Sequence, residues 1–261
     1  MSHRPHIAPD RRNKRAIVLP GGGMRVAYQA GALQRLHDEG LRFSYGDGTS
    51  GGLMNLGALL SGVSPADLAM RWRSLRPTGF ISPLTLRGYL RFPNVTAFGD
   101  FDGITNKVYP HLGIDAEKIR ASTGVMAQFN ICNFRTKAVE PVPHTDIALP
   151  QLLAGMSLPM FTPAVVHAGE TWTDAVWIKD SNLLKCVETG ANEVWVIWCI
   201  GNTPDYRRGT LNQYVHMIEM SAVGALNAEL AEIDRLNVQI RAGEAPFGHK
   251  TPIKVHLIRP D

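Results

Sequence analysis

The chain has 261 residues but only three cysteines, Cys132, Cys186 and Cys199. They form no CxxC pair and no Cys/His ligand spacing, so neither a structural zinc site nor a redox dithiol is expected. Cys132 and Cys199 lie in apolar, strand-like runs. This placement favours buried, free thiols in a protein of a reducing compartment.

Long hydrophobic runs are also missing. The longest apolar stretch, VWVIWCI at residues 194–200, is far shorter than the ~18 residues that a membrane-spanning helix needs. The apolar run that follows the basic start, AIVLP at residues 16–20, is shorter than the ~7–15 residues of a secretory signal. We therefore expect a cytoplasmic protein that is soluble or contacts membranes only peripherally.

No internal repeat and no linker rich in proline, glycine or serine divides the chain. Hydrophobic residues make up 44% of it, which is enough to bury a sizeable core. We expect one domain at residues 15–261, preceded by a basic flexible tail at residues 1–14. The net charge of +4 gives a mild preference for anionic partners such as phospholipid headgroups or nucleic acid.

Strand patterns alternate with helix patterns along the chain, which indicates an α/β fold with a largely parallel sheet. The expected strands are residues 16–19, 41–45, 125–134, 137–142, 171–173, 194–200 and 253–258. The expected helices are residues 26–39, 51–62, 64–75, 149–156 and 211–241. We expect Gly224 to break the last of these helices, because glycine is a poor helix former.

A serine stands between glycines in the pattern Gly48-x-Ser50-x-Gly52, after an expected strand and before an expected helix. A sharp strand-to-helix turn of this kind exposes a serine hydroxyl as a nucleophile, and small neighbours let the backbone fold tightly around it. The pattern alone is weak, since its residue types recur by chance. Its strand–turn–helix context is what favours a nucleophile elbow.

A second glycine cluster, Gly21-Gly22-Gly23, also leaves a strand and opens a helix. The unpaired N–H groups of such a loop can hold a phosphate or a developing oxyanion. The Gly-Lys-Ser/Thr ending of a Walker loop is absent, and Val26 stands where a dinucleotide fingerprint has glycine or alanine. Dinucleotide binding, with Asp47 as the ribose acid, stays open as the weaker alternative. The preferred interpretation is an oxyanion loop that faces Ser50, because it gives both glycine clusters a role in one active site.

These motifs, PGGGMRVAYQAGALQRL and GTSGGLMNLGALLSG, resemble those of the patatin-like phospholipases. The resemblance runs from about Arg15 to Ile200 and implies a three-layer α/β/α fold with a largely parallel central sheet. It further implies a lipid acyl-ester hydrolase that needs no cofactor and no metal. The family's third motif is an aspartate followed by Gly-Gly or Gly-Ala. Lining up the flanking segments places Asp174 there, with Ala175 and Val176 in place of glycines.

What the resemblance implies is a catalytic dyad of Ser50 and Asp174 without a histidine. Asp180 is the fallback for the base, although its position corresponds better to a family asparagine. The resemblance also implies an oxyanion hole in the first cluster, formed by Gly21, Gly22, Gly23, Met24 and Arg25. Within that loop, Gly22, Gly23 and Met24 are expected to donate to the oxyanion, and Arg25 is expected to brace the loop.

The departure after Asp174 keeps a rival open. Valine resists positive φ, so a turn that needs this geometry would displace the carboxylate. The rival is a weak or inactive scaffold that binds lipid or a protein partner. A conventional triad would need His216, His249 or His256 as base, and none of them lies in a catalytic motif.

Two further segments can be interpreted either as functional or as purely structural. Residues 76–102 are irregular, basic and aromatic, as in a lid at a lipid interface or in a surface loop that packs its own aromatics. The helix at residues 211–241 is amphipathic, so it is either an ordinary packing helix or the interface of a homodimer. No nucleic-acid-binding module is recognised, and no nucleic acid partner is expected.

Overall fold

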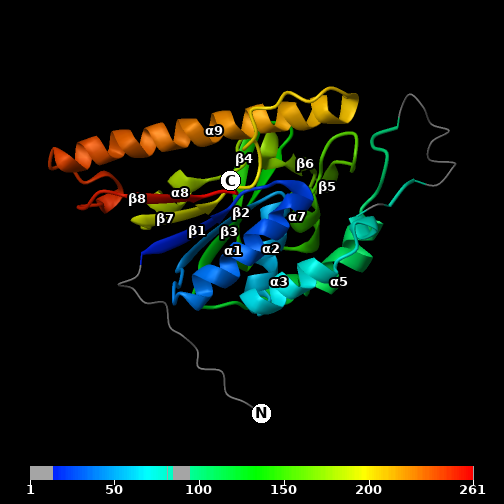
Figure 1. Ribbon diagram of the computed structural model, residues 1–261, viewed down its shortest axis with the longest axis horizontal. Helices are drawn as coiled ribbons and strands as arrows, with labels where there is room; N and C mark the ends of the chain where they lie inside the picture. The colour runs from blue at the N-terminus through cyan, green and yellow to red at the C-terminus, as the bar shows by residue number, and fades with distance from the viewer. Residues whose placement is uncertain (1–13, 81, 85–94, 261) are drawn as a thin grey trace, which may run out of the picture.

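The computed structural model describes residues 14–80, 82–84 and 95–260 (Figure 1). The strands are β1 (Arg15–Leu19), β2 (Tyr45–Thr49), β3 (Met126–Asn133), β4 (Ala138–Pro143), β5 (Val165–His167), β6 (Glu170–Asp174), β7 (Glu193–Ile197) and β8 (Lys254–Ile258). The α-helices are α1 (Ala27–Asp38), α2 (Gly51–Leu60), α3 (Pro65–Ser74), α5 (Tyr109–Leu112), α6 (Ala116–Arg120), α7 (Leu149–Ala154), α8 (Leu183–Glu188) and α9 (Thr210–Arg241). The short helical turns are η1 (Gly23–Val26), η2 (Pro77–Phe80), η3 (Ile104–Val108), η4 (His144–Asp146), η5 (Ala175–Trp177) and η6 (Pro246–Gly248).

The strands form one sheet in the order β5-β6-β3-β2-β1-β7-β8, with β4 paired to β3. Strands β3, β2, β1, β7 and β8 run parallel to one another, and β4, β5 and β6 add antiparallel pairs at one side. Helices flank both faces of this mostly parallel sheet (Figure 1). The predicted α/β/α class is confirmed.

Strand β1 shows how the sequence divides the core between the two faces. Alternate side chains of a strand point to opposite faces, and a central parallel strand is buried on both. Ile17 and Leu19 pack with apolar residues of α1, α2 and α3, whereas Ala16 and Val18 pack with those of α8 and α9. Figure 1 shows α9 on one side of the sheet and α1, α2 and α3 on the other.

Helix α9 runs without interruption through Gly224, so the predicted break is wrong. Its 32 residues extend about 48 Å at 1.5 Å per residue. Gly224 is exposed and has no positive φ, which means that it occupies an ordinary helical position. The apolar face that packs on the sheet, including Ala222, Leu226 and Ile233, stabilises the helix enough to offset one glycine.

The strand predicted at residues 41–45 is also wrong, because the sheet uses Tyr45–Thr49 instead. This strand contains glycine and aspartate, which strands generally disfavour. A Cβ atom at Gly46 would lie 2.9 Å from Leu56 Cδ1, and one at Gly48 would lie 3.0 Å from Leu56 Cδ2. A Cβ atom at Gly48 would also lie 3.1 Å from Leu53 Cα, so the close packing of α2 on the strand favours glycine and offsets the local preference.

Parts of two sequence-based expectations lie outside the described residues. The structure does not describe residues 1–13, which are almost all of the basic tail. It also does not describe residues 81 and 85–94 of the stretch considered as a lid. Among the described residues, no helix has both the length and the apolar character to span a bilayer.

Candidate active site

Ser50 occupies the turn between β2 and α2, directly before Gly51 opens the helix. Its backbone has φ 51° and ψ −131°, a conformation that L-residues adopt only under constraint. Such strain costs of order 1–3 kcal/mol and persists where the surrounding structure fixes it. The turn holds the serine at the carboxyl end of a central parallel strand, as the sequence predicts for a nucleophile elbow.

The glycine after Ser50 in the motif, Gly52, lets α2 approach the end of β1. A Cβ atom at Gly52 would lie 1.9 Å from the carbonyl oxygen of Leu19 and 2.5 Å from that of Pro20. Neither oxygen belongs to a flexible side chain, so the clash cannot be relieved by a rotamer change. Gly48, on the other side of Ser50, is closed in by Leu53 and Leu56 of α2.

Replacing Gly52 with alanine is therefore expected to destabilise the protein by about 3 kcal/mol, because overpacking against backbone moves α2 away from β1. Urea unfolding measures the change. The matched control is Gly224→Ala, where a Cβ would meet nothing within 4 Å. This second substitution should stabilise the protein by about 0.5–1 kcal/mol through helix propensity. Equal stability of the two variants would contradict the packing argument.

The first glycine cluster passes beside Ser50. Gly22 and Gly23 have φ of 150° and 58°, conformations that glycine adopts without strain. The Gly21 N–H donates to Asp180 Oδ1 at 2.8 Å. Gly23 then opens η1, whose first N–H groups lack partners within the turn itself.

Arg25 links this loop to α9. Its Nη1 lies 2.9 Å from Glu219 Oε1, and its Nε donates to the carbonyl oxygen of Gly22 at 3.4 Å. The Arg25 backbone N–H also donates to Gly22 O at 3.1 Å. These contacts are the ones that a bracing role requires.

Strand register brings Asp174 to Ser50. On β3, Asn130 pairs with Thr49 at the end of β2, and the next residue, Ile131, pairs with Asp174 at the end of β6. Strand β4 occupies one edge of β3. Strands β2 and β6 therefore both lie along the opposite edge of β3, where they meet end to end. Ser50 follows Thr49 directly, so the serine and the carboxylate meet there although they are far apart in sequence.

The Asp174 side chain is fully buried, and its Oδ1 accepts the Val176 N–H at 2.9 Å. Burial raises the pKa of this carboxyl to about 7, while hydrogen bonds from the Ser50 hydroxyl and the Val176 N–H lower it. Oδ2 makes no well-aligned hydrogen bond to any described residue. The carboxyl thus faces the serine with one oxygen uncommitted, a looseness common at catalytic hydrogen bonds of free enzymes.

The departure from glycine after Asp174 does not force a strained turn. Ala175 and Val176 both belong to η5, and neither has a positive φ. Asp174 caps this short helix with its own side chain. A valine is compatible with such a turn, so the expected displacement of the carboxylate does not arise.

Asp180, the fallback for the base, borders the same space beside Gly21 as Ser50 does. A Cβ atom at Gly21 would lie 2.6 Å from both Asp180 Oδ1 and Ser50 Cβ, and 3.1 Å from Ser50 Oγ. Burial raises the pKa of Asp180 well above its usual value, the Gly21 N–H lowers it, and Asp174 and Asp47 raise it further. Its Oδ2 is buried without a partner among the described residues.

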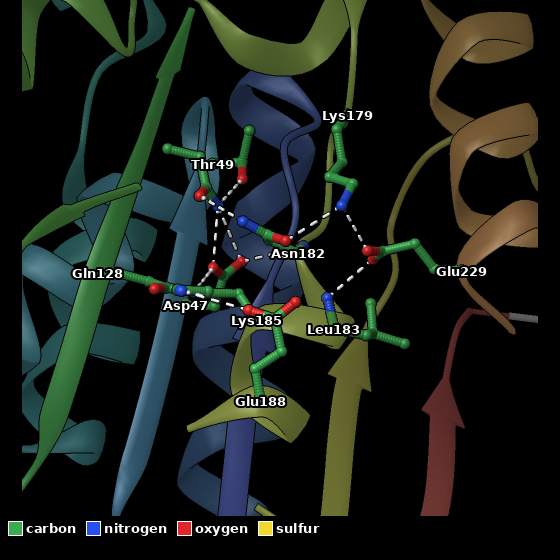
Figure 2. Close-up of polar contacts among 10 residues, drawn as sticks. Asp47, Thr49, Gln128, Lys179, Asn182, Leu183, Lys185, Glu188 and Glu229 are labelled. Carbon is green, nitrogen blue, oxygen red and sulfur yellow. Dashed lines mark hydrogen bonds and ion pairs between the residues drawn. The ribbon is translucent and has the colours of Figure 1, made fainter. Parts of the chain in front are cut away.

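A polar network holds Asn182, in the segment that follows Asp174 (Figure 2). Asp47 accepts hydrogen bonds from Asn130 Nδ2 at 2.9 Å, from Gln128 Nε2 at 2.9 Å and from the Asn182 N–H at 3.3 Å. Asn182 Nδ2 in turn donates to Asn130 Oδ1 at 3.2 Å. Asn130 also donates to Thr49 Oγ1 at 2.8 Å, which ties the network to the residue before Ser50.

The same view shows Lys179 between Asn182 and α9 (Figure 2). Lys179 Nζ lies 2.7 Å from Glu229 Oε1 and donates to Asn182 Oδ1 at 3.2 Å. Glu229 Oε2 accepts the N–H of Leu183, the first residue of α8, at 2.8 Å. Residues on both sides of Asp180 are therefore anchored.

Asp47 does not suit the role of a ribose acid. It is fully buried and surrounded by protein donors, whereas a dinucleotide ribose must be able to reach its acid. Among the described residues, no group of three or more His, Cys, Asp or Glu side chains could hold a metal ion.

The three histidines considered as bases have other surroundings. His216 stacks on Tyr206, His249 Nε2 contacts the carbonyl oxygen of Val187 at 2.8 Å, and His256 stacks on Trp195. Within the described part of the chain, none of them contacts Ser50 or Asp174. A triad using any of them is not favoured.

Sequence reasoning missed the supporting residues Gln128, Asn130, Lys179, Asn182 and Glu229. The pairs that join them are separated by as many as 135 residues, as in the contact of Asp47 with Asn182. No local spacing could have revealed these contacts. An acidic residue on a mostly apolar helix face, as Glu229 is on α9, was the one available hint.

The fold and the turn around Ser50 define a class, an α/β/α protein with a serine at a nucleophile-type turn. The family model of patatin-like phospholipase matches residues 17–184, more than half of the chain. The protein belongs to the patatin-like phospholipase family, which is a family of lipid acyl hydrolases.

Two further comparisons are less informative. The chain is similar in structure to VipD from Legionella pneumophila, with 11% identity and a TM-score of 0.42. This likeness covers 87% of the chain and 54% of VipD, so the chain spans about half of that structure. The search of curated proteins finds no match.

Proposed function

We propose that the protein is a serine acyl-ester hydrolase that acts on lipids, with Ser50 as nucleophile and Asp174 as base. One observation carries the proposal: a serine in a strained turn at a strand end faces a fully buried carboxyl whose pKa lies at about 7. An ordinary aspartate is too weak a base for serine. A carboxyl with a pKa near the working pH is a much better one.

In the proposed reaction, Asp174 accepts the Ser50 proton as Oγ attacks the acyl carbonyl carbon. The carbonyl π electrons move to oxygen, giving a tetrahedral intermediate. When the intermediate collapses, the alcohol leaves with the proton from Asp174 and the acyl group stays on Ser50. Water then attacks the acyl-enzyme, gives its proton to Asp174, and releases the fatty acid as the proton returns to Ser50.

The amides of Gly22, Gly23 and Met24 are proposed to receive the oxyanion. Gly22 precedes η1, and Gly23 and Met24 are its first residues, where N–H groups and the helix dipole favour negative charge. Arg25, held by Glu219 of α9, keeps this loop in place. The reaction as proposed uses only groups of this chain.

An aromatic cluster near Asp174 supports a lipid substrate. Tyr214 packs edge-on against Phe161 and Trp177, with ring centroids 5.0 Å and 5.5 Å apart. Asp174 is close enough to Tyr214 to raise the pKa of its hydroxyl, after the larger effect of burial. Phe161 stays exposed, which gives an acyl chain an apolar surface to contact.

The test is hydrolysis of a chain-length series of p-nitrophenyl esters and of phospholipid vesicles, with Ser50→Ala as the blank. Release above the blank supports the hydrolase, and the preferred chain length defines the acyl group. If neither substrate is cleaved but vesicles still bind the protein, the binding scaffold is the better description.

A pH dependence follows from the buried base. Asp174 accepts a proton only when ionised, and burial raises its pKa to about 7. Below that value its ionised fraction falls as the pH falls. One unit below the pKa, kcat/KM should therefore be about tenfold lower than on the plateau at higher pH. Initial rates in overlapping buffers, with circular dichroism confirming that the fold persists, measure the profile. A flat profile down to about pH 5 would show that the base has an ordinary carboxyl pKa.

A further inference from the structure

Asp180 is a titratable group in direct contact with the glycine loop, and the proposed reaction does not use it. Its Oδ1 accepts the Gly21 N–H at 2.8 Å, and this oxygen and Ser50 together fill the space that a side chain at Gly21 would need. Cys199 Sγ fixes the other side of the same residue by donating to Gly21 O at 3.3 Å. The start of the glycine loop is thus held by Asp180 and Cys199.

The position of Asp180 is itself fixed from both sides. Lys179 is paired with Glu229 of α9, and the backbone and side chain of Asn182 are bonded to Asp47 and Asn130 (Figure 2). A group held this way can determine where a neighbouring loop lies. Asp180 therefore acts on the loop from a rigid support.

The buried carboxyls of Asp47, Asp174 and Asp180 lie near one another, but they accept different numbers of hydrogen bonds from the protein. Asp47 accepts from two side-chain amides and one backbone N–H. Asp174 accepts one backbone N–H through Oδ1, and the neighbouring Ser50 hydroxyl lowers its pKa although its Oδ2 makes no well-aligned hydrogen bond. Asp180 accepts only from Gly21, and its Oδ2 has no partner among the described residues. An ionised carboxylate needs donors on both oxygens when buried. Asp180 is therefore the least suited of the three to carry a charge.

The charges that face Asp180 come from several elements. Asp174 at the end of β6 and Asp47 of β2 both disfavour a further negative charge, and Arg25 of η1 favours it. Cys199, which follows β7, is a neutral thiol because burial raises its pKa to about 12. The Lys179 ammonium next to Asp180 is committed to Glu229.

We propose that Asp180 is a positioning residue that works as a neutral carboxylic acid: it holds Gly21, and with it the oxyanion loop, against Ser50 without adding charge. This inference rests on the proposed hydrolase function. Ionised Asp180 would place a negative charge one residue from the amides that receive the oxyanion, and would oppose charge development there. Rates should consequently fall at alkaline pH, when Asp180 loses its proton.

The test compares pH–rate profiles of wild type, Asp180→Asn and Asp180→Ala on a short-chain p-nitrophenyl ester, after subtracting the Ser50→Ala blank. Asparagine keeps an acceptor for the Gly21 N–H and stays neutral at all pH. This variant should lose less than about tenfold at neutral pH and should lack the alkaline fall. Alanine leaves the loop unheld and should lower kcat about a hundredfold. Asp234→Asn, on the exposed side of α9, is the control and should keep the wild-type profile.

Infrared spectroscopy gives a readout that does not depend on activity. At about pH 9, two units above the pKa of about 7 of Asp47 and Asp174, those two groups are ionised. Wild type should still show the C=O band of a protonated, buried carboxyl at that pH, and Asp180→Asn should lack it, which separates Asp180 from the buried Glu229. Absence of the band would overturn the proposal even if the hydrolase function holds. An alkaline fall unchanged in Asp180→Asn, or full activity of Asp180→Ala, would overturn it as well. A band present without hydrolysis would instead count against the hydrolase function.

Discussion

Replacing Ser50 with alanine is expected to lower ester hydrolysis by at least about 10³-fold, to the level of the uncatalysed background. The substitution removes one oxygen, and alanine pays the same steric cost as serine at φ 51°. The turn and the loop beside it should therefore stay in place. Loss of rate would then report loss of the nucleophile rather than of the fold.

Covalent capture separates the role of Ser50 from a structural one. A fluorophosphonate should form an O–P bond to Ser50 with loss of fluoride, so that the peptide containing Ser50 gains the mass of the phosphonyl group in wild type, and it should leave Ser50→Ala unmodified. Ser61→Ala is the matched control, since Ser61 stands at the other end of α2 and its hydroxyl bonds to the Gly57 carbonyl. This control should lose about 1 kcal/mol of stability and keep its activity. If Ser50→Ala hydrolyses esters as fast as wild type, another group is the nucleophile.

The parts of the fold that follow from local chemistry could be predicted from the sequence. The serine–proline start of α3 and the apolar face of α9 are local patterns, and both helices form where those patterns predict them. The two glycine clusters also open helices, as their strand–turn–helix contexts indicate. In each case a few adjacent residues determine the backbone conformation.

The parts that depend on distant contacts could not be predicted. Strand β2 has a sequence unsuited to a strand, and it forms because β1 and β3 pair with it and α2 packs closely on Gly46 and Gly48. The contact between Asp180 and Gly21 joins residues 159 apart in the sequence. A motif predicts that an aspartate lies near the serine, but the register of β6 on β3 decides that Asp174 faces the end of β2.

Changing Asp174 to asparagine is expected to lower kcat by about 10³-fold while the fold persists. Asparagine can still accept the Val176 N–H through its oxygen, so the cap of η5 is kept. Its amide cannot take up the Ser50 proton, and its N–H₂ group would face the serine where the uncommitted Oδ2 now lies. Fluorophosphonate labelling should slow in parallel, because the same proton transfer activates Ser50 toward the reagent.

The double variant decides whether the two residues act as one unit. If Asp174 works only by activating Ser50, then Ser50→Ala combined with Asp174→Asn should be no slower than Ser50→Ala alone, since effects within a catalytic unit are not additive. If Asp174→Asn keeps most of its activity, the base lies elsewhere. Asp180 is then the next candidate, because its Oδ1 and Ser50 Oγ both border the space that a Gly21 side chain would fill. Its own asparagine variant distinguishes the two roles, because a base cannot be replaced by an amide whereas a neutral positioning group can.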